Sequence, residues 1–190
     1  MVSVLIIPML LIIPNEVKAS DNNQINRTTQ DNIIETIKPY VEVTKSGKIH
    51  FKNLPKGLYQ DYNLSELQKH FDHLNELVES GTITINADLS IQDHSINLRA
   101  VYGKWTYHWW GYDRKFNNQQ AHDYMVYLDT VSEGAGIITG AYEWLPPISG
   151  LSLATSAYLT LLSSRVAANN NGSGVYVSIS YATVFNVEPL

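Results

Sequence analysis

The hydrophobic and polar positions along the chain divide it into a charged front and an apolar, nearly uncharged back. From Gly134 onward only Glu143, Arg165 and Glu188 carry a formal charge, whereas charged side chains occur throughout residues 20–133. The pattern predicts an α+β fold. We expect a small charged α+β region at residues 31–101. At residues 102–190 we expect a short antiparallel sheet that braces an apolar helical hairpin.

One helix of the front region is well defined by its spacing. Its apolar residues recur at intervals of three and four, which places them on one face of a helix; they are Leu64, Leu67, Phe71, Leu74 and Val78. Asn63 followed by Glu66 resembles a capping box, and Gly81 suits the C-terminal end.

The other front elements are predicted to be short. We expect a helix at residues 31–38, a hairpin at 40–51 with its turn at Ser46-Gly47, a loop at 53–62, and strands at 82–87 and 95–102.

The next segment is a run of aromatic residues. Residues 102–112 contain six aromatic side chains, and we expect one strand there. The alternation of a strand places Trp105, Tyr107 and Trp109 on one face and Thr106, His108 and Trp110 on the other. Three interpretations are open: a buried core, a membrane-interface anchor, or a platform on which sugars stack. The candidate interface or ligand platform comprises Trp105, Tyr107, Trp109, Trp110 and Trp144.

The apolar back predicts two helices. The first is expected at residues 119–132 with a cap at Asn117 or Asn118, and the second at residues 148–168. The 21 residues from Trp144 to Ser164 carry no formal charge. As a helix they would be about 32 Å long, close to the ~30 Å thickness of a bilayer core. Three interpretations of the apolar hairpin are open: the buried core of a soluble domain, a hairpin that inserts conditionally into lipid, or a constitutive transmembrane anchor. Small residues recur at helical spacings, and the candidate helix-packing residues are Gly136, Gly140, Ser152, Ser156, Thr160 and Ser163.

A final strand is predicted after the turn at residues 169–174. Val175, Val177, Ile179 and Tyr181 alternate with Tyr176, Ser178 and Ser180, and Val184 to Val187 continue the pattern. We expect this strand to pair with the aromatic strand.

The first residues have the features of an export signal. Residues 2–13 are almost continuously apolar but too short to span a bilayer, and Val17-Lys18-Ala19 suits signal-peptidase cleavage. We therefore expect a signal peptide at 1–19, a disordered mature N-terminus at 20–30, and a secreted, extracellular protein.

Composition excludes several classes of chemistry. The chain has 190 residues, a formal net charge of −5 and no cysteine. It therefore has no disulfide and no thiolate ligand or nucleophile, and its acidic balance argues against a nucleic-acid partner.

No catalytic, metal or cofactor signature is found. His70 and His73 are one helical turn apart, but the chain lacks a His-Glu-x-x-His motif, a Gly-x-Ser-x-Gly motif and a phosphate loop. We expect His70 and His73 on a solvated helix face, with no metal and no cofactor. If all six histidines became charged, the net charge would change from −5 to about +1. We therefore expect acid to favour membrane association.

Two segments carry a family resemblance. Lys104-Trp-Thr-Tyr-His-Trp-Trp-Gly111 and Asn171-Gly-Ser-Gly-Val-Tyr-Val-Ser-Ile179 flank the Gly/Ala/Ser-rich apolar stretch. Together they resemble a loose family of small secreted Gram-positive bacterial proteins. The resemblance covers residues 102–187, with Tyr181 where the family has Trp. It implies secretion and this architecture, and the hydrophobic segment is similar to those of bacteriocin-like peptides.

Two functions follow as expectations. The first is a secreted, non-enzymatic protein of bacteriocin or toxin type whose apolar hairpin inserts into membrane lipid, with an immunity protein as a partner. The second is a soluble extracellular module whose aromatic strand binds cell-wall glycan or a protein partner. An enzyme is the third alternative.

Overall fold

The protein combines helices with small antiparallel sheets, as an α+β fold requires. The structure is a computed structural model that describes residues 31–94, 102–133, 144–146 and 156–190. Residues 31–37 are helical and lead into the 3-10 helix η1 (Lys38–Tyr40), close to the helix predicted at 31–38.

The front region consists of two hairpins and two helices. In chain order its elements are β1 (Val41–Val43), β2 (Ile49–Phe51), α2 (Lys56–Asp61), α3 (Ser65–Glu79), β3 (Ile83–Ile85) and β4 (Ile91–Asp93). β1 pairs antiparallel with β2, and β3 pairs antiparallel with β4. The hairpin predicted at 40–51 is therefore confirmed. The loop predicted at 53–62 is partly wrong because it contains α2.

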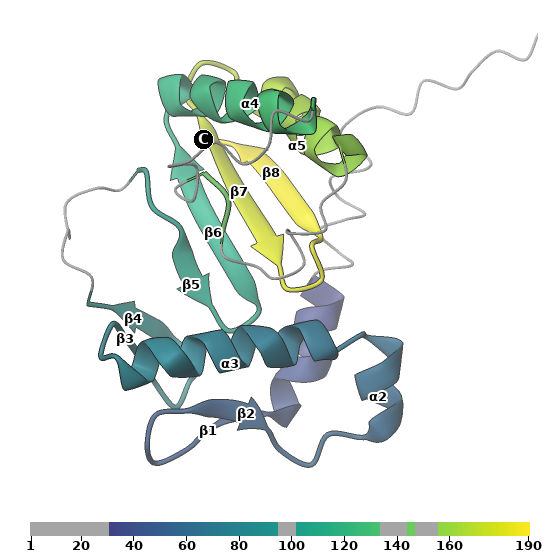
Figure 1. Cartoon of the computed structure of the whole chain (residues 1–190), viewed down its shortest axis with the longest axis vertical. Helices are drawn as coiled ribbons and strands as arrows, with labels where there is room; N and C mark the ends of the chain where they lie inside the picture. The colour runs from purple at the N-terminus through teal and green to yellow at the C-terminus, as the bar shows by residue number, and fades with distance from the viewer. Residues whose placement is uncertain (1–30, 95–101, 134–143, 147–155) are drawn as a thin grey trace, which may run out of the picture.

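The back region contains a four-stranded antiparallel sheet with the order β5-β6-β7-β8. Its elements are β5 (Thr106–His108), β6 (Gly111–Phe116), α4 (Asn118–Ser132), α5 (Ser156–Asn169), β7 (Val175–Ser180) and β8 (Phe185–Pro189). Figure 1 shows α4 and α5 together at one end of the sheet and α3 crossing near its other end.

Helices α3 and α4 begin in different ways. α4 has the full capping box: the Asn117 side chain accepts a hydrogen bond from the Gln120 backbone, and the Gln120 side chain accepts one from the Asn117 backbone. The capping box predicted at Asn63 is wrong, because the N-cap of α3 is Leu64, which makes no side-chain cap hydrogen bond. Asn63 itself has φ 47°, the left-handed conformation of a turn residue.

The aromatic segment is a hairpin rather than one strand. β5 ends at His108, Trp109 and Trp110 form the turn, and β6 begins at Gly111. Only glycine fits at position 111: its φ is +153°, and a Cβ atom there would lie 2.2 Å from the carbonyl oxygen of Ile179. Because of this turn, Trp109 and Trp110 both pack against the front core, Trp109 as a buried member and Trp110 as a partly buried neighbour, which the alternation of a single strand could not predict.

The C-terminal strand also folds back on itself. β7 pairs with β6 from Gly111–Ser180 to Phe116–Val175, and then β8 pairs with β7 after a turn that includes Thr183 at φ 60°. The predicted pairing with the aromatic segment is therefore confirmed at Gly111 and Tyr112. The predicted continuous strand through Val187 is replaced by a hairpin.

Two hydrophobic cores form. The front core surrounds α3, and Trp109 and Tyr181 enter it from the turns of the four-stranded sheet. The back core lies between this sheet and helices α4 and α5. Tyr107 packs against both cores. The front and back regions therefore share a hydrophobic junction at the β5–β6 and β7–β8 turns.

Candidate functional site

The predicted aromatic platform does not form a single surface. Trp105 and Trp144 pack against the back core, Trp109 is only 5% exposed in the front core, and Tyr107 lies between the two cores. Trp110 lines a cavity. The interpretation of these residues as core is thus confirmed for Trp109, and the five are divided between the two cores: Trp105, Tyr107 and Trp144 pack against the back core, whereas Trp109 and Trp110 pack against the front core.

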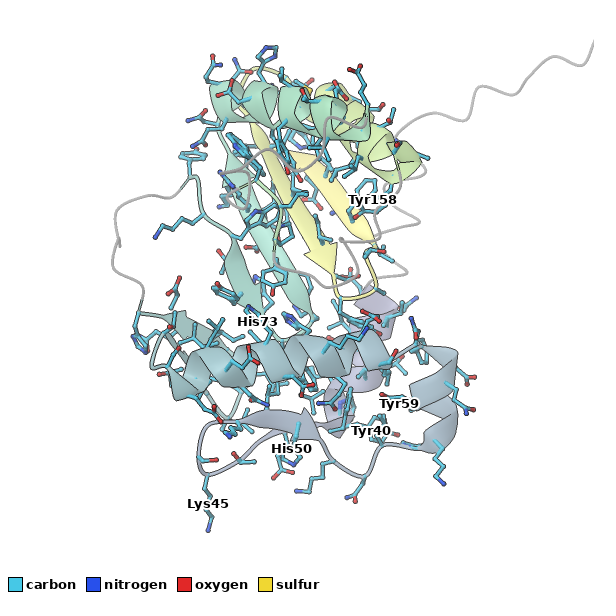
Figure 2. All side chains as sticks on the ribbon, in the orientation of Figure 1. Tyr40, Lys45, His50, Tyr59, His73 and Tyr158 are labelled. Atoms are coloured by element: carbon cyan, nitrogen blue, oxygen red, sulfur yellow. The ribbon has the colours of Figure 1, made fainter. Side chains whose placement is uncertain are left out.

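The inner face of the sheet holds a buried cation among aromatic rings. Arg114 is 4% exposed, and its guanidinium lies 4.4 Å from the ring centre of Phe116 and 5.1 Å from that of Trp144. Phe116 and Tyr124 stack at 4.5 Å. On α5, Tyr158 meets Phe185 of β8 edge-on at 5.4 Å (Figure 2). Sequence reasoning missed Arg114, although its alternation with Tyr112 and Phe116 placed it on the inner face.

The outer face of the same sheet is polar. Alternation places His108 on β5, Asp113 on β6, Tyr176 and Ser178 on β7, and Asn186 on β8 on this face. Ser178 is 5% exposed and Asn186 is 6% exposed. The outer face therefore offers hydrogen-bonding groups that are largely withdrawn from bulk water.

Asp113 lies at the centre of this polar face. The Tyr176 hydroxyl donates to Oδ2 of Asp113 at 2.9 Å, and Nε2 of His108 lies 3.0 Å from the same oxygen. The His108 contact lacks the alignment of a hydrogen bond, so we treat it as electrostatic. Burial alone would raise the pKa of Asp113, but His108, Tyr176 and Thr106 together hold this pKa below its ordinary value. Asp113 is therefore a fixed carboxylate that orients the Tyr176 ring.

His108 also positions Trp110. The two rings stack with centres 4.7 Å apart and planes 6° apart. One face of the Trp110 indole is therefore covered, and because Trp110 also packs against the front core, a ligand can contact only the part of the ring that lines the cavity.

A cavity of about 260 Å³ lies on this outer face. It lies between the sheet and the helical segment 31–37, and its lining residues are Asp31, Ile34, Trp110, Tyr176, Ser178, Asn186 and Glu188. Nδ2 of Asn186 donates to Oε1 of Glu188 at 2.7 Å. Drug-sized ligands occupy pockets of roughly 300–1,000 Å³, so this cavity suits a single sugar unit or one side chain better than a large cofactor.

Most residues of this cavity were not predicted as a site. The signal for Tyr176 and Ser178 is their alternation with the buried residues of β7. No pattern in the sequence predicts that Asp31 and Glu188 lie near each other. They line the same cavity because the C-terminal hairpin lies next to the helical segment 31–37.

The predicted helix-packing residues have mixed positions. Ser163 is buried in α5, whereas Ser156 and Thr160 are exposed. Helix α5 instead packs through Leu159, Leu162 and Val166. Gly136, Gly140 and Ser152 lie outside the described residues.

The histidines also differ from expectation. His70 is 6% exposed rather than solvated, and its Nε2 lies 2.7 Å from the carbonyl oxygen of His108. His73 projects from α3 and His50 lies on β2 (Figure 2). Burial lowers the pKa of His70 to about 4, so this residue stays neutral in mild acid and the full six-charge change does not occur in the folded chain.

The described residues contain no metal-binding cluster and no helix that could span a membrane. In residues 31–94, 102–133, 144–146 and 156–190, no group of three or more His, Asp or Glu side chains could hold a metal ion. Over the same ranges, every helix is too short or too polar to cross a lipid bilayer.

Comparison with known proteins does not test the family resemblance, which stays a prediction. No family model, curated protein or solved structure matches this chain.

Proposed function

We propose that this protein is a secreted extracellular binding module that recognises cell-wall glycan through the outer-face cavity. The observation that carries the proposal is the combination, in one cavity, of the Trp110 and Tyr176 rings with the polar side chains of Ser178, Asn186 and Glu188. Sugars present apolar C–H faces and polar hydroxyl edges, and this lining offers a partner for each.

The aromatic part of the cavity is held in place before any ligand binds. His108 covers one face of Trp110, and Asp113 accepts a hydrogen bond from Tyr176. A ring that is already ordered loses little conformational entropy when a sugar stacks on it. The fixed position of both rings therefore favours binding.

The polar side chains of the cavity can form hydrogen bonds in defined directions. Ser178 supplies a hydroxyl group, and Asn186 and Glu188 are joined by a hydrogen bond. Such groups distinguish a ligand that pairs with them from one that leaves them buried and unpaired.

A titration of the purified chain with N-acetylglucosamine oligomers, followed by calorimetry, tests the proposal, together with a pull-down on peptidoglycan. We expect binding by the wild type and loss of binding in Trp110→Ala. Trp105→Phe is the matched control because Trp105 packs on the opposite face of the sheet. Absence of binding to every glycan by the wild type, with the fold intact by circular dichroism, would refute the proposal.

Membrane insertion is a second candidate, and one surface favours it. The exposed residues of α5 are all uncharged; they are Ser156, Ala157, Thr160, Leu161, Ser164, Ala167 and Ala168. Leu161 is 48% exposed. A helix face with an exposed leucine and a single half-buried charge, that of Arg165, can lie in a lipid interface more readily than a highly charged one.

Dye release from anionic vesicles tests this candidate. We expect release by the wild type and loss of release in Leu161→Asp. Val126→Asp on α4 is the control, since Val126 is 53% exposed on the neighbouring helix. Vesicles that stay intact at neutral and at acidic pH would eliminate membrane insertion.

A further inference from the structure

One imidazole is connected to both aromatic residues of the outer-face cavity. The His108 ring stacks on the Trp110 indole with ring centres 4.7 Å apart, and its Nε2 lies 3.0 Å from Oδ2 of Asp113. The same carboxylate oxygen accepts the hydrogen bond of the Tyr176 hydroxyl. Trp110 and Tyr176 both line the cavity. The state of His108 therefore bears on both rings that a sugar would contact.

The contact between His108 and Asp113 is incomplete. Nε2 of His108 is buried and has no hydrogen-bond partner among the described residues, although it lies close to the carboxylate. A neutral imidazole has one N–H donor and the charged form has two, so a proton on His108 ensures that a donor faces Asp113. A charged donor forms a shorter and stronger hydrogen bond with a carboxylate. The positive ring is also attracted to the indole face on which it stacks.

The backbone of His108 is held by the front region. Nε2 of His70, on α3, lies 2.7 Å from the carbonyl oxygen of His108. Burial lowers the pKa of His70 to about 4, so His70 stays neutral in mild acid. An ordinary histidine changes its charge between about pH 5 and pH 8. This backbone contact therefore stays the same over that range.

Acidic residues of three neighbouring elements act near His108. Asp113 of β6 contacts its ring, and Asp93 of β4 acts electrostatically on the residue before it. Asp31, before the cavity, lines the space that the stacked indole also lines. These three charges attract a positive charge at His108. Glu188 lies on β8, three strand spacings of about 4.8 Å from β5, so solvent ions screen it.

The basic groups of the neighbouring elements oppose this attraction only weakly. Gly111 lies opposite His108 in the sheet, and Lys115 is four residues further along β6. Strand geometry separates them by about 13 Å, which exceeds the screening length of about 8 Å at physiological salt. His73, on α3, has the Glu76 carboxylate of its own helix 3.9 Å away. A proton on His108 therefore meets a net attraction.

We propose that mild acid strengthens glycan binding at the outer-face cavity through a proton taken up by His108. This inference rests on the proposed function, since it assumes that the cavity binds glycan. The charged imidazole bonds to Asp113 and holds the Trp110 ring more firmly, so less conformational freedom is lost when a sugar stacks there. His108 is thus a positioning residue that acts through Trp110 and Asp113.

Calorimetry of the full chain with an N-acetylglucosamine oligomer at about pH 7.5 and about pH 5.5 tests the inference. The oligomer is uncharged at both values, so a change in affinity arises in the protein. We expect binding to be about threefold to tenfold tighter at the lower pH. Acid destabilises the fold through His70, so tighter binding in acid does not come from a more stable fold.

Two variants assign the effect to this pair. His108→Phe keeps a flat ring for the stack but removes the charge, so its affinity should be equal at the two pH values. Asp113→Asn keeps an oxygen that accepts from the Tyr176 hydroxyl but removes the negative charge, so most of the pH dependence should be lost. His122→Gln, at an exposed position on α4, is the matched control and should keep the full pH dependence.

The outcomes separate this inference from the proposed function. If the wild type binds equally at both pH values, or more tightly at about pH 7.5, the pH inference is wrong and the glycan-binding function remains. If the folded wild type binds at neither pH, both are wrong. An unchanged pH dependence in Asp113→Asn or in folded His108→Phe also overturns the inference.

Discussion

Nε2 of His70 lies 2.7 Å from the carbonyl oxygen of His108, and this contact joins helix α3 to strand β5. The imidazole also meets the Tyr112 ring nearly edge-on, with ring centres 5.1 Å apart. His70 is therefore a polar contact between the front region and the four-stranded sheet.

The first prediction concerns acid stability. Burial lowers the pKa of His70 from 6.5 to about 4 in the folded chain. Below the unfolded pKa the unfolded chain binds a proton that the folded chain does not, so stability falls as pH falls from 6.5 towards 4. The loss is about 1.4 kcal/mol per pH unit, or about 2 kcal/mol at pH 5.

Urea unfolding at about pH 7.5 and about pH 5 measures this loss. His70→Gln keeps an N–H donor for the His108 carbonyl but removes the titrating group, so it should reduce the pH dependence. His122→Gln, at an exposed position on α4, should leave it unchanged. An equal pH dependence in wild type and His70→Gln would contradict the assignment.

The second prediction concerns the Trp-Trp turn. Gly111→Ala would place a Cβ atom 2.2 Å from the Ile179 carbonyl oxygen, between β6 and β7. We expect it to cost more than about 3 kcal/mol or to prevent folding. Gly57→Ala in helix α2 is the opposite case, because its Cβ would meet nothing within 4 Å. It should stabilise the chain by about 0.5–1 kcal/mol in thermal or urea unfolding.

The third prediction concerns the cap of α4. Asn117→Ala removes the side-chain acceptor for the Gln120 backbone N–H and should cost about 1 kcal/mol. Asn117→Ser keeps an oxygen acceptor and should lose much less. A loss of equal size in the two variants, by urea unfolding, would show that capping is not the cause.

The fourth prediction compares two tyrosine hydroxyls. The Tyr124 hydroxyl is buried and has no hydrogen-bond partner among the described residues, whereas the Tyr176 hydroxyl donates to the Asp113 carboxylate. Tyr124→Phe should be neutral or stabilise the chain by up to about 1 kcal/mol, and Tyr176→Phe should cost about 1.5 kcal/mol. The same unfolding assay ranks the two variants, and the reverse order would overturn this account of the two faces of the sheet.

The sequence predicts the elements whose signal is local. The apolar stripe of α3, the Asn117 cap and the alternation along β7 depend on spacing within one segment, and the structure agrees with all three. Two local predictions fail, the capping box at Asn63 and the loop at 53–62, and the two errors in the strands lie at Trp109-Trp110 and near Thr183. In both places a segment that alternates like one strand turns back, because pairing with a neighbouring strand outweighs local pattern.

The candidate site depended on long-range proximity. Asp31 and Glu188 lie near opposite ends of the described chain, so no spacing rule relates them. Trp110 was predicted as part of a platform with Trp105 and Trp109, but the turn directs Trp109 into the front core. Which aromatic residues share a surface was therefore decided by the turn rather than by composition.

The two residues of that turn have a joint mechanical consequence. Trp109 is anchored among the side chains around α3, while its neighbour Trp110 borders the cavity. A ligand bound against Trp110 therefore restrains the Trp109-Trp110 turn, through which the four-stranded sheet contacts the front core. Ligand binding in the cavity is thus expected to slow the separation of the front and back regions. A higher thermal unfolding temperature in the presence of a ligand would therefore report binding.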